Sequence, residues 1–178
     1  METLDAIFTR HSVRTYTDEP VTDEQVETLL KSAMSGPSCT NAKDWSFIVV
    51  RDQETLSKMA DANGPPANPL RHCPLAILIC GDLERAFPPA PDYWVIDGAI
   101  AGQNICLAAH AMGLGAVWLG TWPQMERVHG QRQLFGLPYS VMPHSIIAIG
   151  HPAAEGAGGP PRPSKPDDPA SHVHYEKW

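Results

Sequence analysis

Apolar residues are most concentrated between residues 98 and 113, a stretch without any Asp, Glu, Lys or Arg. They fall on every side of a helical wheel, a pattern typical of a helix in the middle of a folded domain. Such a helix is roughly 24 Å long at ~1.5 Å per residue, too short to cross a bilayer. We predict a central core helix that begins with Asp97 as its N-cap and ends at Gly113, and whose small residues let a partner helix approach closely.

Shorter alternations of apolar and polar positions predict the remaining elements. Thr22 and Gln25 form a capping-box pattern ahead of apolar residues at helical spacing. Helices are expected at 2–9, 22–34, 53–61 and, more weakly and broken near Gly130, at 124–135. Buried strands are expected at 46–50, 75–80, 116–120 and 145–150, and a loop rich in Pro, Gly and Asn at 63–74. Strands that alternate with helices indicate an α+β or α/β layered fold.

The chain of 178 residues is expected to form a single domain, 1–178, because no linker or internal repeat divides it. Its last 28 residues contain six prolines and three glycines, which excludes a packed helix or a central strand. Tyr175 and Trp178 are large aromatic side chains that gain from a pocket. We therefore interpret 152–178 as an extended arm that docks on a neighbouring surface, with a disordered tail as the alternative.

Composition narrows the class of protein. A net charge of −7 argues against unspecific nucleic-acid binding, for which a basic surface is expected. The first residues lack the basic and apolar regions of a signal peptide, so a cytoplasmic protein without a membrane partner is expected. Four scattered cysteines indicate buried small residues rather than a disulfide framework. His172 and His174 alternate along the tail, but no further ligand is spaced to complete a metal site, so none is predicted.

Two polar clusters are candidates for chemistry. Arg10, Ser12 and Arg14 lie at a helix-to-loop boundary, and two guanidinium groups with a hydroxyl suit a phosphate. Two solvated surface arginines would give the same pattern. The polar turn at 36–45 precedes a buried strand, and alone it predicts no more than a loop.

Several motifs occur together in order along the chain. These are Arg-His-Ser-Val-Arg at 10–14, Pro-Ser-x-x-Asn-x-x-x-Trp at 37–45, Gln-Asn-x-x-Leu-Ala-Ala-x-x-x-Gly-Leu-Gly-x-x-Trp at 103–118, Ile-Ile-Ala-Ile-Gly-His-Pro at 146–152 and Val-His-Tyr-Glu-Lys-Trp at 173–178. With them the chain resembles the nitroreductase family of flavoenzymes from Leu4 to Trp178. The resemblance implies a three-layer α-β-α fold of the α+β class, with a mainly antiparallel central sheet flanked by helices, in an intertwined homodimer.

The resemblance also implies FMN bound at the subunit interface and indicates its contacts. The phosphate and the ribityl side are assigned to Arg10, His11, Ser12 and Arg14. A second phosphate anchor in the tail is assigned to Lys165, with Arg162 as the fallback. A loop from the second subunit, which runs along the flavin, is assigned to Pro37, Ser38, Thr40 and Asn41. The backbone that faces flavin N5 is assigned to Leu119 and Gly120. A weaker match, to an Asn-x-x-Lys pair at the pyrimidine edge, is Asn68 with Arg71.

The implied activity passes a hydride from NADH or NADPH through flavin N5 to a nitroaromatic, quinone or similar small acceptor, by a ping-pong cycle. The flavin carries this chemistry, so no catalytic side chain is expected. A flavin-binding carrier or sensor with little turnover is the alternative, and a structural dimer that has lost the cofactor is a third interpretation. One departure is Lys43-Asp44, where relatives usually have Gln-Pro, and it leads us to expect an added positive charge near the flavin.

Overall fold

The computed structural model describes residues 1–153 and 168–178. Its centre is a four-stranded antiparallel sheet of order β1-β2-β4-β3, formed by β1 (Trp45–Val50), β2 (Leu75–Asp82), β3 (Gly115–Gly120) and β4 (Val141–Gly150). The central strands β2 and β4 are buried over most of their length, which explains their continuous apolar sequence. All four predicted strands are confirmed, and β1 and β3 form the two edges of the sheet.

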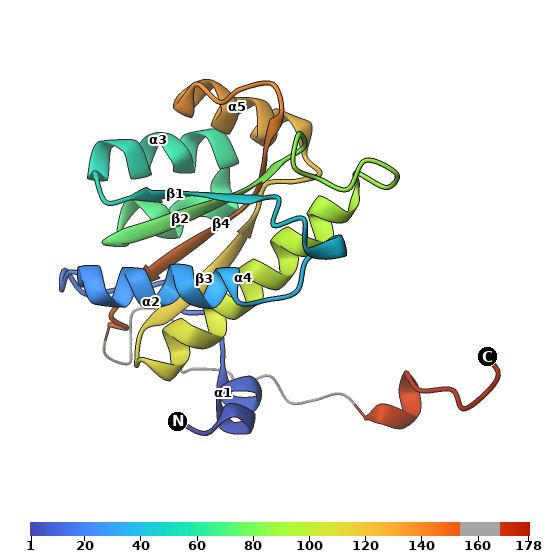
Figure 1. Cartoon of the computed structure of the whole chain (residues 1–178). Coiled ribbons are helices and arrows are strands. Elements are labelled where there is room, and N and C mark those ends of the chain that lie inside the picture. Colours follow the sequence, from blue (N-terminus) through green and yellow to red (C-terminus); the bar gives the residue numbers. More distant parts are fainter. Residues whose placement is uncertain (154–167) are drawn as a thin grey trace.

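Helices cover both faces of this sheet (Figure 1). One face packs against α2 (Asp23–Met34) and α4 (Tyr93–Ala111), and the other against α3 (Gln53–Asn63), the 3-10 helix η2 (Pro65–Arg71) and α5 (Met125–Phe135). Side chains of β2 alternate between the two cores, since Ile77 and Ile79 pack with α2 and α4 whereas Leu78 packs on the α3 side. The predicted three-layer α-β-α fold is therefore confirmed. The short helix α1 (Thr3–Thr9) contacts α4.

The central helix α4 begins earlier than predicted. Its first residue is Tyr93, so the expected role of Asp97 as the N-cap is wrong. The Asp97 side chain is instead buried and accepts a hydrogen bond from the backbone of Cys39. The carboxylate of Asp97, near the start of α4, thus holds the loop around Cys39 in place instead of capping its own helix.

Two small residues of α4 make room for aromatic rings of the chain's own sheet. A Cβ atom on Gly98 would lie 3.0 Å from His144, and one on Gly102 would lie 2.2 Å from Trp118. The helix that packs along α4 is α2 of the same chain. The small residues of α4 were predicted to let a partner helix approach. Two of them, Gly98 and Gly102, instead make room for the side chains of His144 and Trp118 from the sheet.

Helix ends and interruptions test the local predictions. The capping box is confirmed, because Thr22 Oγ1 accepts from the Gln25 N–H at 3.2 Å and Gln25 Oε1 accepts from the Thr22 N–H at 2.8 Å. The predicted break near Gly130 is wrong, since α5 is continuous there. A Cβ on Gly130 would lie 3.0 Å from the Cβ of Ala62, so this glycine lets α3 and α5 approach closely. The predicted loop at 63–74 contains η2, which starts with a proline where the missing N–H costs nothing.

The described end of the tail, 168–178, contains the 3-10 helix η3 (Pro169–Ser171) and extends away from the rest of the chain (Figure 1). The Trp178 side chain is fully exposed, and its ring stacks on His174 with 4.4 Å between ring centroids. Tyr175 is also exposed. Docking of this arm on a second subunit stays a prediction. No helix in the described part of the chain combines the length and apolar character needed to cross a membrane.

Candidate functional site

The segment that follows α1 runs along the outer edge of β3. Ser12 forms a parallel bridge with Ala116, and the Val13 N–H donates to the Ala116 carbonyl at 3.0 Å. The hydroxyl of Tyr16 donates to the Val13 carbonyl at 2.6 Å, which fixes the backbone between them. The side chains of Ser12 and Arg14 are exposed on this fixed backbone.

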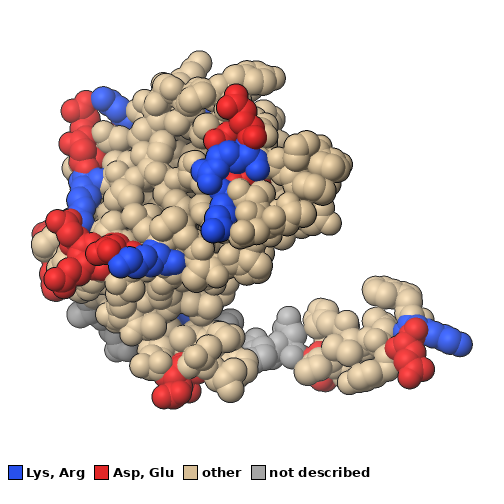
Figure 2. Space-filling view, in the orientation of Figure 1, with Lys and Arg blue, Asp and Glu red and all other residues tan. Residues whose placement is uncertain are grey.

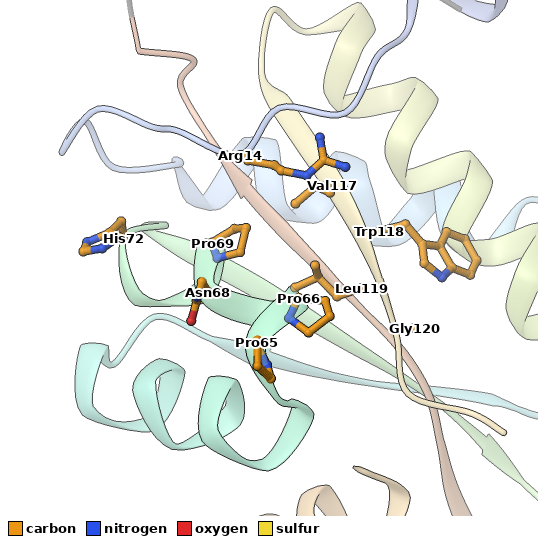
Figure 3. A pocket seen from close by; sticks show the side chains of 10 residues that line it. All are labelled: Arg14, Pro65, Pro66, Asn68, Pro69, His72, Val117, Trp118, Leu119 and Gly120. Carbon is orange, nitrogen blue, oxygen red and sulfur yellow. The ribbon is translucent and has the colours of Figure 1, made fainter. Parts of the chain in front are cut away.

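A cleft of about 530 Å³ opens between this segment, η2 and β3. Its lining residues are Arg14, Pro65, Pro66, Asn68, Pro69, His72, Val117, Trp118, Leu119 and Gly120. In Figure 3 the Arg14 side chain lies above Val117, with the prolines and Asn68 of η2 on one side and the indole of Trp118 turned away on the other. Four predicted flavin contacts, from three separate segments, thus lie around one cleft in the structure. They are Arg14, Asn68, Leu119 and Gly120.

A buried polar network fixes the peptide at the end of β3. The Gly120 carbonyl accepts from Asn63 Nδ2 at 3.1 Å and from Arg127 Nη1 at 2.9 Å. The Thr121 hydroxyl donates to Asn63 Oδ1 at 2.9 Å, and both of these side chains are fully buried. A Cβ built on Gly120 would meet no atom of the described residues within 4 Å, so the Cα of this residue faces open space among them. The sequence analysis missed Asn63, Thr121 and Arg127. Asn63 contacts Gly120 and Thr121 across 57 and 58 positions, a distance that no local motif signals, and Arg127 is seven positions from Gly120 but belongs to no recognised motif.

Arg71 lies outside the cleft that contains Asn68. Its guanidinium pairs with Asp61 at 2.5 Å, and the residue lines a neighbouring cleft of about 460 Å³. His72, which the sequence analysis also missed, lines both clefts. The structure therefore separates the two members of the weakly matched pair.

The remaining residues of the predicted phosphate site lie at the α1 end of the N-terminal segment. Arg10 and His11 are half-buried next to α4, and the His11 and His110 rings meet edge to face at 5.8 Å. Lys165 and its fallback Arg162 lie outside the described residues.

The loop predicted to contact the flavin of a second subunit lies beside the opposite edge of the sheet. Pro37 and Ser38 precede the 3-10 helix η1 (Cys39–Asn41), which leads into β1. The edge strands β1 and β3 are three strand spacings, or about 14 Å, apart. The loop is strained, because Thr40, Asn41 and Lys43 have positive φ angles of 49°, 61° and 51°. Each such residue costs roughly 1–2 kcal/mol and persists only where its surroundings hold it.

Two buried carboxyl groups lie beneath this loop. Both oxygens of Asp97 accept from the Cys39 N–H, at 3.1 and 2.9 Å, and Ser38 Oγ accepts from the Lys43 N–H at 3.0 Å. Asp44 is fully buried, and neither oxygen of its side chain has a hydrogen-bond partner within residues 1–153 and 168–178. Burial, followed by the negative charge of Asp97, raises the pKa of Asp44 to about 6. The departure at 43–44 therefore adds a buried acid as well as the exposed ammonium of Lys43.

An aromatic cluster lies between the cleft and α4. The His144 ring meets those of Trp94 and Trp118, each at 5.8 Å, and Trp94 meets Trp122 at 5.1 Å. Burial lowers the pKa of His144 to about 4, so this imidazole is neutral at pH 7. The cluster forms a rigid apolar backing to β3, because Trp118 belongs to that strand.

Two apolar surfaces are left uncovered by the described residues of the chain. A shallow groove on the outer side of α4 is lined by Val95, Ile96, Ala99, Ile100, Gln103 and Asn104. The predicted apolar face of α1, which is Leu4, Ile7 and Phe8, is exposed as well. Figure 2 shows that the surface over α4 carries mainly uncharged residues. Contiguous exposed apolar patches mark interaction sites.

Cysteine and metal chemistry find little support in the described residues. All four cysteines are free, and three of them are buried. Burial raises the thiol pKa of Cys73 to about 11, of Cys80 to about 12 and of Cys106 to about 11, which disfavours the reactive thiolate. Within 1–153 and 168–178 no group of three or more His, Cys, Asp or Glu residues is placed to hold a metal ion.

Comparisons with known proteins cover nearly the whole chain. The family model described as the Nitroreductase family matches residues 7–68 and 62–151. A protein of Methanothermobacter thermautotrophicus, provisionally named NADH dehydrogenase/NAD(P)H nitroreductase, is 42% identical over 100% of this chain and 88% of its own length. The FMN reductase (NAD(P)H) of Bacillus subtilis is 31% identical over 92% of this chain and 71% of its own. The solved structure of an FMN-dependent nitroreductase from Clostridium difficile R20291 is similar with a TM-score of 0.86 and 29% identity, covering 98% of this chain and 99% of its own.

Proposed function

The chain belongs to the nitroreductase family, and we propose that it is an FMN-dependent oxidoreductase that uses NADH or NADPH to reduce a nitroaromatic, a quinone or a similar small acceptor. When bound, FMN supplies hydride chemistry at N5 that no side chain provides. The chain's own residues then have to hold the phosphate, orient the ring system and leave one face open. Donor and acceptor would use that open face in turn, which corresponds to a ping-pong cycle.

The observation that carries this proposal is the cleft itself. Three segments of the chain place a guanidinium, an amide side chain and an open backbone, those of Arg14, Asn68 and Gly120, around one space of about 530 Å³. Arg14 would attract the negative charge of the cofactor, and Asn68 can both donate to and accept from a polar ring edge. The Gly120 carbonyl is turned into the protein by two hydrogen bonds, so the backbone there is held in place for a ligand.

The uncharged residues behind the cleft also support the proposal that it binds FMN. The residues behind β3 are aromatic, and His144 among them is neutral because burial lowers its pKa to about 4. This backing is apolar, and Arg14 is one of the few polar groups that line the cleft in front of it, as is typical of small-molecule sites.

We propose further that the active form is a homodimer. A second copy would cover the apolar surfaces of α4 and α1, where Ile96 is 52% and Phe8 53% exposed. It would also bring the loop with Ser38, Thr40 and Asn41 of one chain to the cleft of the other, since in a single chain the two lie near opposite sheet edges. The tail would cross to the partner, with Val173, Tyr175 and Trp178 as its apolar anchors. Truncation after His151 should then lower dimer stability and FMN retention together, and a truncated chain that stays dimeric and retains FMN would contradict this role.

Flavin binding and turnover test the function directly. FMN is added to the purified protein, free ligand is removed, and bound flavin is quantified by absorbance. NADH and NADPH oxidation are then followed with a nitroaromatic and with a quinone as acceptor. Stoichiometric FMN with reduction by either dinucleotide and turnover of an acceptor is the expected result. Bound FMN that neither dinucleotide reduces would favour a carrier, and no FMN binding at any concentration would overturn the proposal.

A further inference from the structure

Two imidazoles meet where the N-terminal segment passes the last turn of α4. The ring centroids of His11 and His110 are 5.8 Å apart in an edge-to-face arrangement. Arg10 lies next to them, and its positive charge acts on both His110 and Cys106, which is one helical turn earlier on α4. The cluster thus consists of two titratable imidazoles and one permanently charged guanidinium, contributed by the N-terminal segment and α4.

The hydrogen bonds of Thr9 determine which nitrogen of each imidazole carries a proton. The Thr9 hydroxyl donates its single hydrogen to the Asp5 carbonyl at 2.6 Å, so it accepts from His110 Nε2 at 2.8 Å. His11 Nδ1 lies 3.1 Å from the Thr9 carbonyl, which can only accept. Both rings therefore use one N–H for structure, and His11 Nε2 and His110 Nδ1 are left to take up a proton.

The charges around the cluster are unbalanced. No ion pair among the described residues includes Arg10, His11 or His110. From α1, Asp5 offers its backbone carbonyl while its side chain is exposed, and from α4 the thiol of Cys106 is neutral because burial raises its pKa to about 11. Burial, and then the charges of His11 and Arg10, lower the pKa of His110. An anion beside this cluster would reverse that repulsion and favour the imidazolium form.

We propose that the His11–His110 pair is the proton-accepting part of the flavin phosphate site, with His110 as a positioning residue that acts through His11 and Arg10. Binding of the phosphate monoester draws a proton onto the pair, and the new positive charge strengthens the hold on the phosphate. The inference rests on the proposed function, because it takes FMN as the ligand and the Arg10 end of the segment as its phosphate anchor. The result is a cofactor affinity that falls as pH rises through the range where imidazoles titrate.

The test compares FMN with riboflavin, which lacks the phosphate, in titrations of the full-length flavin-free protein from about pH 6.5, the ordinary imidazole value, up to about pH 8.5. Calorimetry in two buffers of different ionisation enthalpy measures the protons taken up. Wild-type protein should bind FMN on the order of 3- to 10-fold more weakly at the higher pH, with net proton uptake, while riboflavin binding changes little. These measurements on the wild type alone can overturn the inference, by an FMN affinity without pH dependence or by equal pH dependence for riboflavin.

A neutral variant locates the effect. His110→Gln keeps a donor for Thr9 but cannot become charged, so it should bind FMN with a flat pH profile and reduced proton uptake. His129→Gln, an exposed histidine on α5, is the matched control and should behave like the wild type. An unchanged profile in His110→Gln would overturn the role of His110 while leaving the proposed function intact. Absence of FMN binding to the wild type at every pH would instead overturn the proposed function.

Discussion

The cleft beside β3 and the loop beside β1 are built on opposite principles. The cleft is walled by regular elements, and its key peptide at Gly120 is held by hydrogen bonds from Asn63 and Arg127. The loop contains three residues with positive φ, which are Thr40, Asn41 and Lys43. It lies over Asp44, a buried acid whose carboxyl oxygens have no hydrogen-bond partner in the described part of the chain. The cleft is therefore preformed, whereas the loop stores strain.

This difference suggests a separate role for the cleft and for the loop, which we call the rigid half and the strained half of the proposed site. Strain in a backbone is maintained where the surrounding structure or a ligand requires that conformation. The loop presents Thr40 and Asn41 to solvent, away from the cleft of its own chain. We infer that one chain carries the rigid half of one site and the strained half of another. Four substitutions, which form three tests, probe this comparison.

The largest effect is expected from a charge on the apolar surface of α4. Ile96→Glu places a carboxylate in the proposed dimer interface at a side chain that is 52% exposed, so the fold of the single chain should survive. If both halves of the site are needed, dimer formation should fail and FMN affinity should fall more than about 100-fold, or roughly 3 kcal/mol. Analytical ultracentrifugation and FMN titration measure the two effects. Met125→Glu on α5, at a comparably exposed residue, is the control, and tight FMN binding by a monomeric Ile96→Glu protein would show that the cleft alone suffices.

A smaller effect is expected from the rigid half. Arg14→Ala removes the guanidinium that lines the cleft, and Arg10→Ala removes the one beside His110. Each change should weaken FMN binding by roughly 1.5–3 kcal/mol, the range for hydrogen bonds to charged groups. Fluorescence titration with FMN measures the loss. Arg132→Ala, at a guanidinium 5.3 Å from the Tyr139 ring, should leave the affinity unchanged, and wild-type affinity in both test variants would place the phosphate elsewhere.

The smallest effect is expected from the strained half, as a dependence of stability on pH. Burial and Asp97 raise the pKa of Asp44 to about 6 in the folded chain, above its ordinary value of 3.8. The folded state therefore binds this proton more tightly than the unfolded state, and the stabilisation it gives is lost as pH rises from about 4 to about 6. Asp44→Asn should be more stable than the wild type at pH 7.5, by about 2 kcal/mol or less, and should lose that advantage at pH 4.5.

Urea denaturation of both proteins at the two pH values isolates the contribution of Asp44. The comparison with the variant is needed because His144 acts in the opposite direction. Its pKa is lowered to about 4, so its contribution is lost as pH falls below 6.5. A difference between wild type and Asp44→Asn that is the same at both pH values would show that Asp44 stays ionised.

The sequence predicts the fold well where the signal is local. The capping box of Thr22 and Gln25 and the apolar runs of β2 and β4 each lie within a few residues, and all are confirmed. The wrong predictions concern Asp97 and Gly130, which are explained by contacts with Cys39 and Ala62 from other elements. An aspartate near the start of a helix suggests a cap, and a glycine inside one suggests a break. Neither residue type reveals a contact with a residue far away in the sequence.

The candidate site was predictable only where a family motif covers it. Arg14 belongs to such a motif, Leu119 and Gly120 directly follow another, and Asn68 comes from the weaker match. The structure places these four residues around one cleft. The residues that hold this cleft in shape do not form motifs, since Asn63 and Thr121 are 58 positions apart and meet only through the packing of α3 against the end of β3. Completion of the site by a second subunit, as proposed above, would likewise be a property of the assembly rather than of the single chain.

The aromatic cluster behind β3 gives the protein an optical consequence. Three of its five tryptophans, which are Trp94, Trp118 and Trp122, lie in this one group beside the cleft. Their ultraviolet emission originates from an apolar interior, whereas Trp178 emits from water while stacked on His174. A bound chromophore in the cleft would accept excitation energy from the first group far more efficiently than from the second. The emission spectrum therefore contains a component that reports occupancy of the cleft and a component that reports the surroundings of the tail.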